Sequence, residues 1–416
     1  MNSQHDTIIY HVDVNSAFLS WEAAYRVDIL GDTTDLRNIP SVIGGDEAKR
    51  HGIVLAKSTS AKKYGIITGE PLIQAHKKCP NLVVAKPDFS LYVDYSDKFI
   101  SLLKEYAPQV EQYSIDEAFC DMSGTKRLYG DPVEFAYRLK DTIKNTLGFT
   151  VNIGISTNKL LAKMASDFEK PDRVHTLFPE EIDEKLWPLP VSDLFFVGNS
   201  TSKKLNNMGI KTIGELAHAD LSIIKYHFKK HGEVIWNYAN GIDDSSLERP
   251  PAQNKGYGNS LTIHHDVTDR DEAKRVLLSL CETVGARIRA DHSYISVISV
   301  NIVDSEFNNH SHQMSLSSST DVTEKIYDCA CLLFDKLWDM SPIRLLGVQT
   351  SKATTENYQQ INMFDMDKYE KLSKLNNAID NIRHKYGDDS IKRACFVNQE
   401  EAHMTGGLSK AKMNKK

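Results

Sequence analysis

Hydrophobic positions in the first 175 residues follow two different periods. Apolar runs and strict alternation predict strands, whereas apolar residues at every third or fourth position predict amphipathic helices. The predicted strands are 7–12, 109–114, 118–122 and 149–155, and the predicted helices are 17–27, 92–106, 132–147 and 158–168. Between the first helix and the second, 52–57 predicts a further strand and 60–65 a helical turn. The order is a βαββαβ pattern with an insertion after its first strand.

The same βαββαβ order returns near the carboxyl end of the chain. Its predicted elements are strand 260–267, helix 271–291, strands 293–303 and 313–319, helix 322–340 and strand 343–351. The block between the two patterns, 176–249, is helical, and prolines at 250 and 251 followed by a glycine-containing stretch mark a linker. We therefore predict an α+β multidomain protein.

Composition is that of an ordinary folded chain. Its 416 residues are 41% hydrophobic and 25% charged, which is enough for several domains with cores of their own. The polar first seven residues lack a signal-peptide core, and no apolar run approaches the roughly 20 residues that span a bilayer. Six scattered cysteines form no C-x-x-C pair. We expect a cytoplasmic monomer without a membrane partner.

Two neighbouring acids, Asp116 and Glu117, stand between two predicted strands. Adjacent residues on a strand point to opposite faces, so a sharp turn is needed to aim both carboxylates at one point. Cations of the magnesium type are bound by one or two carboxylates together with substrate phosphates. The pair therefore indicates a cation site, and the alternative is an exposed hairpin tip.

A third acid, Asp13, follows the first predicted strand. If that strand lies beside the hairpin, at the strand spacing of about 4.8 Å, all three carboxylates meet at one sheet edge. Three carboxylates can hold two metal ions at roughly 3.5–4 Å separation, which suits in-line attack on phosphorus. A lone Asp in this place is more often a helix N-cap, but the acidic pair favours the metal site.

Three segments carry a resemblance to a known family. Asp13-Val-Asn-Ser-Ala-Phe18, Leu91-Tyr-Val-Asp-Tyr-Ser96 and the stretch 113–124 resemble those of the Y-family translesion DNA polymerases. The likeness is greatest to the UmuC-like branch of the UmuC/DinB superfamily, which includes the catalytic subunit of bacterial polymerase V, and it extends over about 8–398. It implies a magnesium-dependent DNA-directed DNA polymerase, a nucleotidyltransferase that copies damaged template without proofreading in DNA repair and an SOS-type response.

The resemblance also implies roles for residues near the acids. Asp13, Asp116 and Glu117 would be the catalytic carboxylates that bind two Mg²⁺ ions, and the backbone carbonyl of Val14 would complete one metal's shell. Ala17 and Phe18 would contact the nucleotide, with Phe18 as a steric gate against the ribose 2′-hydroxyl. The alternative for Phe18 is an ordinary apolar helix residue.

Nucleotide-binding positions further along depart from the family pattern. Lys62 stands where most relatives have Arg, and Thr59 where many have Tyr. A point-charge ammonium then replaces a bidentate guanidinium, so phosphate neutralisation is kept but tight clamping is in doubt. Lys170, before Pro171, matches the family's second triphosphate-binding lysine. The alternative for the lysines is a solvated surface.

The resemblance divides the chain as follows: palm 1–25 and 85–175, fingers 26–84, thumb 176–249, little finger 250–355 and a tail 356–416. In the thumb, Val197, Gly198, Asn199 and Ser200 resemble the turn of a helix-hairpin-helix, whose backbone amides bind DNA phosphate. Asn199-Ser200 replaces the usual second glycine, so an ordinary helical turn is the alternative interpretation.

Charge weakens the expectation of tight DNA binding. The net charge is −6, and when the chain is divided into 1–175, 176–249, 250–355 and 356–416, only 356–416 has an excess of basic residues, whereas DNA-binding proteins normally show a basic face. A segment of the tail would compensate for weak DNA binding. It resembles the peptide by which bacterial polymerases bind the sliding clamp, and its matching residues are Gln360, Ile361, Met363 and Phe364. Tethering raises the local DNA concentration without new DNA contacts. After residue 400 we expect disorder.

The partners expected are therefore primed DNA template, dNTPs and the sliding clamp. The sequence does not decide whether an accessory subunit or a recombinase filament is required. Two other function classes stay open: a nucleotidyl cyclase, because Gly44-Gly-Asp-Glu47 imitates a cyclase motif, and a non-catalytic DNA- or clamp-binding factor. The cyclase motif lies in the insertion rather than on the acidic hairpin, and three intact carboxylates argue against a binding factor.

Overall fold

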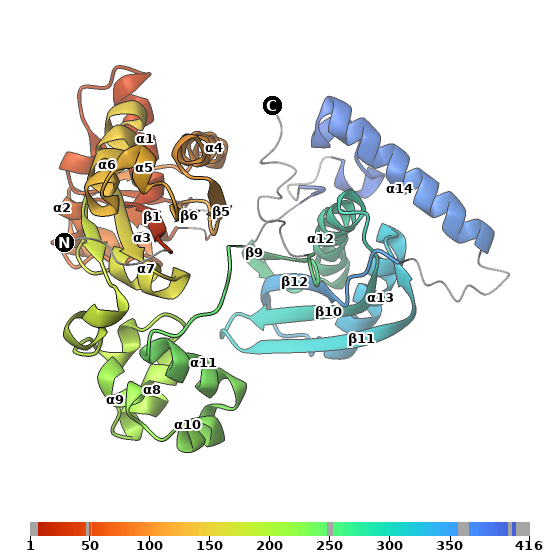
Figure 1. Ribbon diagram of the computed structural model, residues 1–416. Helices are drawn as coiled ribbons and strands as arrows, with labels where there is room; N and C mark the ends of the chain where they lie inside the picture. Colours follow the sequence, from red (N-terminus) through yellow and green to blue (C-terminus); the bar gives the residue numbers. More distant parts are fainter. Residues whose placement is uncertain are drawn as a thin grey trace. The chain divides into compact units, whose positions relative to one another are not determined.

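The computed structural model describes residues 7–46, 50, 52–247, 253–356, 366–397 and 402–404. The chain divides into two compact units (Figure 1). The first comprises Met1–Gly45 and Ile53–Pro251, and the second comprises Asp46–Gly52 and Ala252–Lys416. No helix among the described residues is both long and apolar enough to cross a membrane.

A five-stranded sheet in the order β5-β6-β1-β7-β8 forms the centre of the first unit. Strand β1 pairs antiparallel with β6 on one side and with β7 on the other, and β8 runs parallel to β7. The predicted palm strands are confirmed to within a few residues. Their bounds are β1 Ile9–Val14, β5 Gln109–Gln112, β6 Glu117–Asp121 and β7 Val151–Ser156, and a fifth strand, β8 Val174–Thr176, was not predicted.

The two faces of this sheet are covered by different helices. Tyr10 and Val12 of β1 are fully buried in the larger core, which also takes in Trp21, Tyr92 and Phe99. That face is covered by α1, α4 and α6, whereas α7 packs on β1 and β7 from the other face. The bounds are α1 Ala17–Asp28, α4 Phe89–Tyr106, α5 Lys126–Tyr129, α6 Pro132–Leu147 and α7 Lys159–Ser166.

Gly154 permits the close contact between β7 and α7. A Cβ at this position would overlap backbone atoms of Ala162 and Ser166, so any larger residue would separate the helix from the strand. Because β1 lies beside β7, this contact also determines how near α7 comes to the residues of β1 that face it.

The insertion after α1 forms a small sheet of its own, in the order β3-β2-β4. Its core contains Val42, Val54, Ile66 and Leu72. The strand and turn predicted there are present, but β2, β4 and α3 were missed because elements of three to seven residues carry too little periodicity. The bounds are β2 Ser41–Gly44, β3 Val54–Lys57, α2 Thr59–Lys62, α3 Leu72–Lys78 and β4 Val83–Ala85.

The last part of the first unit is helical, as predicted. Leu194, Leu205, Ile213 and Ile235 meet in its core, which continues into Leu161 of α7. The helices are α8 Asn199–Asn207, α9 Ile213–Ala217, α10 Leu221–Phe228 and α11 Lys230–Ala239. Short 3-10 or π turns in the chain occupy Leu36–Asn38, Pro179–Glu181, Ile182–Leu186, Val191–Asp193, Asp388–Ser390 and Ala394–Phe396.

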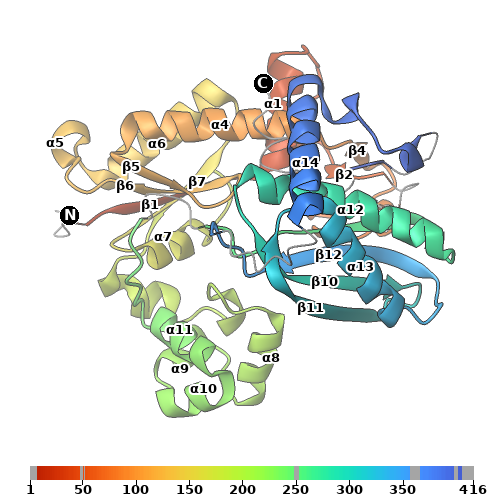
Figure 2. The ribbon, with the colours of Figure 1, turned by 90° about the vertical axis from the view of Figure 1, so that its right-hand side faces the viewer.

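The second unit contains the second βαββαβ pattern. Its sheet has the order β11-β10-β12-β9 with antiparallel neighbours, and α12 and α13 contribute Val276, Leu280 and Phe334 to a core against it (Figures 1 and 2). Every predicted element is present. The bounds are β9 Gly258–Val267, α12 Arg270–Ala290, β10 Ile295–Asp304, β11 Asn309–Thr320, α13 Thr323–Leu337 and β12 Ile343–Ser351.

One long helix, α14 (Met366–Tyr386), lies within the predicted tail and was not predicted. It packs on the rest of the second unit through charged contacts: buried Arg383 pairs with buried Glu282 of α12 at 2.6 Å, and half-buried Asp380 pairs with buried Arg289 at 2.5 Å. Figure 2 shows α14 beside α12. Because polar contacts hold α14, its sequence has only a weak apolar periodicity, which explains why this helix was not predicted.

The expectation of disorder beyond residue 400 is wrong for 402–404, which the structure describes. His403 is buried and contacts Arg383, with 3.4 Å between Nδ1 and Nη2. The Ser279 hydroxyl donates to the carbonyl of Ala402 at 2.7 Å. These three residues are held by polar contacts to the second unit, which composition does not reveal.

Candidate functional site

The register of the central sheet places the predicted acids together. Asp13 on β1 lies directly opposite Glu117 on β6, and opposed residues of an antiparallel pair project from the same face. The amide of Val14 donates to the carbonyl of Asp116 at 3.0 Å, so Asp116 continues this pairing at the bend before β6. The carboxylate of Asp116 accepts from the Ser114 hydroxyl at 2.7 Å. The expectation that the first strand lies beside the acidic hairpin is confirmed.

The three acids act on one another electrostatically. Burial raises the pKa of Asp13 to about 6; Lys170 opposes this shift, and the charges of Glu117 and Asp116 add to it. Burial would also raise the pKa of Glu117, but hydrogen bonds from His11 and Lys163 outweigh it and lower that pKa to about 2. Glu117 is therefore firmly anionic, whereas Asp13 depends on a neighbouring cation to stay charged at neutral pH.

Two lysines and a histidine hold the carboxylates. Lys170 pairs with Asp13, and Lys163 of α7 pairs with Glu117. His11 Nε2 lies 3.0 Å from Glu117 Oε2, while His11 Nδ1 lies 2.7 Å from the Ser166 hydroxyl. Burial lowers the pKa of His11, so the ring is neutral, and because a carboxylate only accepts, the proton lies on Nε2.

The acids do not form a common ligand set in this conformation. Among the residues that the structure describes, no three His, Cys, Asp or Glu side chains are grouped closely enough to hold a metal ion. Asp13 and Glu117 are turned toward Lys170 and Lys163 instead. The donors themselves, carboxylates beside the backbone of Val14, are the hard oxygen ligands that Mg²⁺ takes, so the donor chemistry fits that ion.

Phe18 lies on the first turn of α1, five residues after Asp13. Its ring stacks on Tyr92 of α4 with 4.7 Å between the ring centroids and 10° between the planes, and it meets Phe89 edge-on. Ala17 is buried and Phe18 is half-buried. Stacking on a fully buried tyrosine restricts the motion of the Phe18 ring.

The residues predicted to bind the triphosphate come from separate elements. Lys170 follows α7 and contacts Asp13 directly. Thr59 and Lys62 lie on α2, beside the small sheet of the insertion, and both are exposed. Of these three predicted residues, all within the described part of the chain, only Lys170 contacts one of the acids.

The predicted phosphate-binding turn begins α8. Val197 is buried, whereas Gly198, Asn199 and Ser200 are exposed. Gly198 is the N-cap residue and provides no side-chain hydrogen bond to the first-turn amides. The clamp peptide, Gln360, Ile361, Met363 and Phe364, lies outside the described residues.

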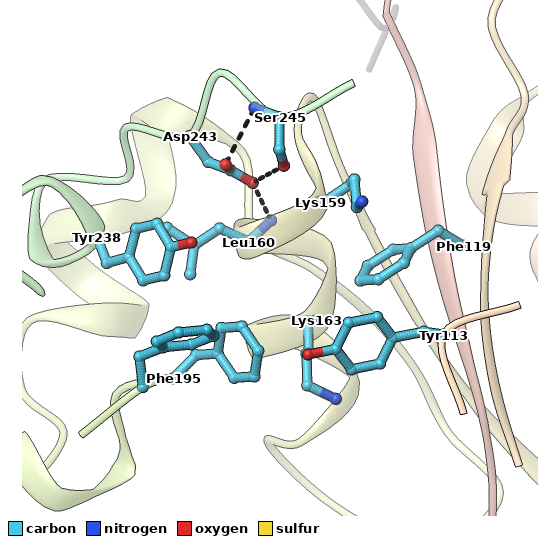
Figure 3. A pocket seen from close by; sticks show the side chains of 10 residues that line it. Tyr113, Phe119, Lys159, Leu160, Lys163, Phe195, Tyr238, Asp243 and Ser245 are labelled. Carbon is cyan, nitrogen blue, oxygen red and sulfur yellow. Dashed lines mark hydrogen bonds between the residues drawn. The ribbon is translucent and has the colours of Figure 1, made fainter. Parts of the chain in front are cut away.

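A pocket of about 180 Å³ adjoins Lys163 (Figure 3). The rings of Tyr113 and Phe119 line one side, and those of Phe195 and Tyr238 line the other. The Lys163 ammonium lies 5.3 Å from the centroid of the Tyr113 ring and 5.4 Å from that of Phe195. The lysine that holds Glu117 is thus itself held between aromatic rings.

Sequence reasoning missed the roles of His11, Lys163 and Asn152. His11 could have been found, because it stands two residues before Asp13 and so points to the same face of a strand. Lys163 lies on the predicted helix 158–168, but the pattern of that helix does not indicate a contact with Glu117. Asn152 is opposite Asp13 across β1 and β7, a pairing that only the strand order reveals.

Comparisons with known proteins cover most of the chain. Residues 12–167 match the impB/mucB/samB family, 179–210 match the HHH motif of the IMS family, and 254–363 match the C-terminal domain of the impB/mucB/samB family. A protein of Clostridium acetobutylicum named DNA polymerase IV is 50% identical over 394 residues, which are 95% of this chain and 99% of that protein.

Two further comparisons agree. A protein of Bacillus subtilis (strain 168) named DNA polymerase IV 2 is 36% identical over 400 residues, covering 94% of this chain and 95% of that one. The solved structure of a Y-family DNA polymerase chimera, Dbh-Dpo4(243-245)-Dbh, superposes with a TM-score of 0.71 at 20% identity and covers 84% of this chain and 100% of that one. At this identity the last match concerns the fold.

Proposed function

This chain belongs to the impB/mucB/samB family of Y-family translesion DNA polymerases, and we propose that Asp13, Asp116 and Glu117 are the carboxylates with which it transfers nucleotides. It is a DNA-directed DNA polymerase. The observation that supports the site is the cross-strand placement of Asp13 opposite Glu117, with the backbone of Asp116 bonded to that of Val14. The relatives named above are called DNA polymerase IV, so assignment to the UmuC-like branch stays a prediction.

Two Mg²⁺ ions are the cofactor proposed for this site, held by the three carboxylates and the carbonyl of Val14. When bound, they would supply the charge that activates the primer 3′-hydroxyl and neutralises the pyrophosphate leaving group. Binding would require Asp13 to turn from Lys170, whereas Glu117 could offer Oε1, because His11 and Lys163 both contact its Oε2. His11 keeps its hydrogen bond to one oxygen of Glu117 and so orients the other.

With the metal ions bound, the lysines would have a second role. Once released from Asp13, the Lys170 ammonium would bind a phosphate oxygen of the incoming dNTP, with Lys62 and Thr59 of the insertion as further contacts. Lys163, between the rings of Tyr113 and Phe195, would stay near Glu117 and limit the net negative charge of the site. Primed template would be held in part by the exposed amides at the start of α8.

Primer extension tests the catalytic proposal. Purified protein with Mg²⁺, primed DNA and four dNTPs should lengthen the primer, and Asp116→Ala should reduce the rate by at least about 1,000-fold, because two-metal phosphoryl transfer depends on each ligand. Asp121→Asn is the matched control, since this acid ends β6, the strand that Asp116 precedes, and its carboxylate accepts from the amide of Ser123 at 2.9 Å. A cyclic product formed without template would identify the cyclase alternative instead. Unchanged extension by Asp116→Ala would refute the site.

Phe18 is proposed as the steric gate, with Ala17 beside it. Its ring is held against Tyr92, so a 2′-hydroxyl above it would meet an immobile wall. Phe18→Ala should therefore raise ribonucleotide incorporation relative to deoxyribonucleotide incorporation by about 100-fold or more. Leu19→Val, a change in the buried face of the same helix, is the control. Equal sugar discrimination in Phe18→Ala would remove the role.

Clamp tethering is proposed to compensate for the net charge of −6. Phe364→Ala should abolish stimulation of synthesis by the sliding clamp and leave clamp-independent synthesis unchanged. Full stimulation of that variant would contradict the tether. All six cysteines are free, which is consistent with the reducing cytoplasm that we propose as the compartment of a monomeric enzyme.

A further inference from the structure

A buried amide completes the row of residues to which Asp13 belongs. Strand β7 pairs with β1 on the side away from β6, and Asn152 lies directly opposite Asp13. Opposed residues project from the same face, so Glu117, Asp13 and Asn152 form one row across three strands. Unlike the two acids, Asn152 has no exposed surface. A polar side chain in such a position must have hydrogen-bond partners.

Asn152 uses both its donors and its acceptor. Its Nδ2 donates to the carbonyls of Ser166 at 3.0 Å and Glu169 at 2.7 Å. Its Oδ1 accepts from the amide of Arg173 at 3.3 Å and from Asn15 Nδ2 at 3.3 Å. Two carbonyls can face only the amino group, so the orientation of the amide is fixed by its partners.

These partners enclose the segment 166–173, which carries Lys170. Glu169 immediately precedes this lysine and Arg173 follows it by three residues. Asn15 adds one more restraint, because its Oδ1 accepts from the amide of Asp172 at 3.0 Å. The backbone is therefore held by two side-chain amides on both sides of Lys170, which itself reaches back to Asp13.

We propose that Asn152 and Asn15 are positioning residues for nucleotide binding. They fix the segment 166–173 so that the Lys170 ammonium is presented to the triphosphate beside Asp13. The inference rests on the proposed function of Lys170 and Asp13. A lysine on an unrestrained segment would lose conformational entropy on binding phosphate, whereas here the fold has already ordered its backbone.

The hydrogen-bond partners of residue 152 explain why it is an asparagine. Aspartate at 152 would place a carboxylate oxygen against two carbonyl oxygens, and an apolar residue would leave those carbonyls and the Arg173 amide without their partner. Asn15 lies two residues after Asp13 on the chain that leaves β1. The proposed metal ligand Asp13 and the backbone that carries Lys170 are thus both positioned by the same pair of strands, β1 and β7.

The test compares Asn152→Ala and Asn15→Ala with wild type. The protein is bound to primed DNA whose primer ends in a dideoxynucleotide, so the dissociation constant of the correct dNTP is measured without chemistry. Hydrogen exchange of 166–173 is measured on the same samples. We expect a 10- to 100-fold weaker dNTP affinity and faster exchange in this segment, because binding must then order a backbone that the side-chain amide no longer holds. The affinity for the DNA itself should not change.

Ser156→Ala is the matched control. Ser156 is also fully buried on β7 and its hydroxyl also donates to a backbone carbonyl, that of Leu177, away from Lys170. This variant should lose stability but keep wild-type dNTP affinity. If Asn152→Ala does not fold, Asn15→Ala still decides the question, since it removes the bond to Asp172 alone from the 166–173 backbone.

Three results would overturn the proposal, and each has a different meaning. Wild-type dNTP affinity in folded Asn15→Ala and Asn152→Ala, with Lys170→Ala weakened, would show that Lys170 binds phosphate without this positioning. Wild-type affinity in Lys170→Ala would instead show that the proposed role of Lys170 is wrong, and the inference would fail with it. Weakening by Ser156→Ala to the same extent would show a general stability effect.

Discussion

Alanine at Gly154 tests whether the contact between β7 and α7 holds the site in register. The added Cβ would lie 2.0 Å from the carbonyl oxygen of Ala162 and 2.4 Å from the amide nitrogen of Ser166, whereas ordinary contacts begin at 3.4 Å. Both obstacles are backbone atoms, so no side-chain rotation relieves the overlap. The helix would have to move by about 1.4 Å.

That displacement has two measurable effects. Overpacking of a rigid contact destabilises proteins by about 1–3 kcal/mol, and we expect the upper part of this range here. The helix also carries Lys163, which holds Glu117, and leads into the segment of Lys170. A displacement of about 1 Å at reacting groups costs about 100-fold in rate. Nucleotide incorporation should therefore fall by about 10- to 100-fold even in the folded fraction.

Urea unfolding followed by tryptophan fluorescence measures the first effect, since Trp21, Trp187 and Trp236 belong to the first unit. Single-nucleotide incorporation at saturating primed DNA measures the second. Gly258→Ala is the control, because Gly258 also lies on a strand with an ordinary φ, but its closest contact would be the flexible Gln349 side chain at 3.1 Å, and the nearest backbone atom, the Val348 oxygen, would lie at an ordinary 3.6 Å.

The reasoning would be refuted by a Gly154→Ala protein whose unfolding free energy is within about 0.5 kcal/mol of wild type and whose incorporation rate is unchanged. Loss of stability with a normal rate would show that α7 packs tightly but does not position the carboxylates. The two measurements thus separate packing from catalysis.

Three further outcomes are expected. Lys163→Met leaves Glu117 without its cation, so the free energy of unfolding measured in EDTA should fall by up to about 3 kcal/mol, and Mg²⁺ should restore part of it. An equal loss with and without Mg²⁺ would contradict this. Glu282→Ala removes the buried carboxylate that pairs with Arg383, so amide exchange of α14 should accelerate while that of β10 does not, and unchanged exchange in α14 would be the contrary result. Burial and Arg383 lower the pKa of His403 below its usual 6.5, so the folded state resists protonation. Docking of 402–404 should therefore be strongest above about pH 6.5 and weaken as pH falls below it, measured by exchange at pH 7 and 5.5.

Local sequence patterns were sufficient to predict most of the helices and strands and the acidic residues of the site. The strands around Asp116 and Glu117 and the long helices of both units follow from periods that are written in consecutive residues. Short elements such as β2 and β4 were missed, because three or four residues hold at most two repeats of the strand period. The helix α14 was missed because charged contacts rather than an apolar face hold it in place.

The sequence by itself determined the family, the order of elements and the acidic residues, since these depend on residue types at fixed spacing along the chain. Only the tertiary structure decided what stands beside those acids. Strand order puts β6 on one side of Asp13 and β7 on the other, and this brings Asn152 opposite it and α7 with Lys163 above it. Such neighbours are distant in sequence and meet through hydrogen bonding between strands and the close packing that Gly154 allows, and neither leaves a periodic pattern in the chain.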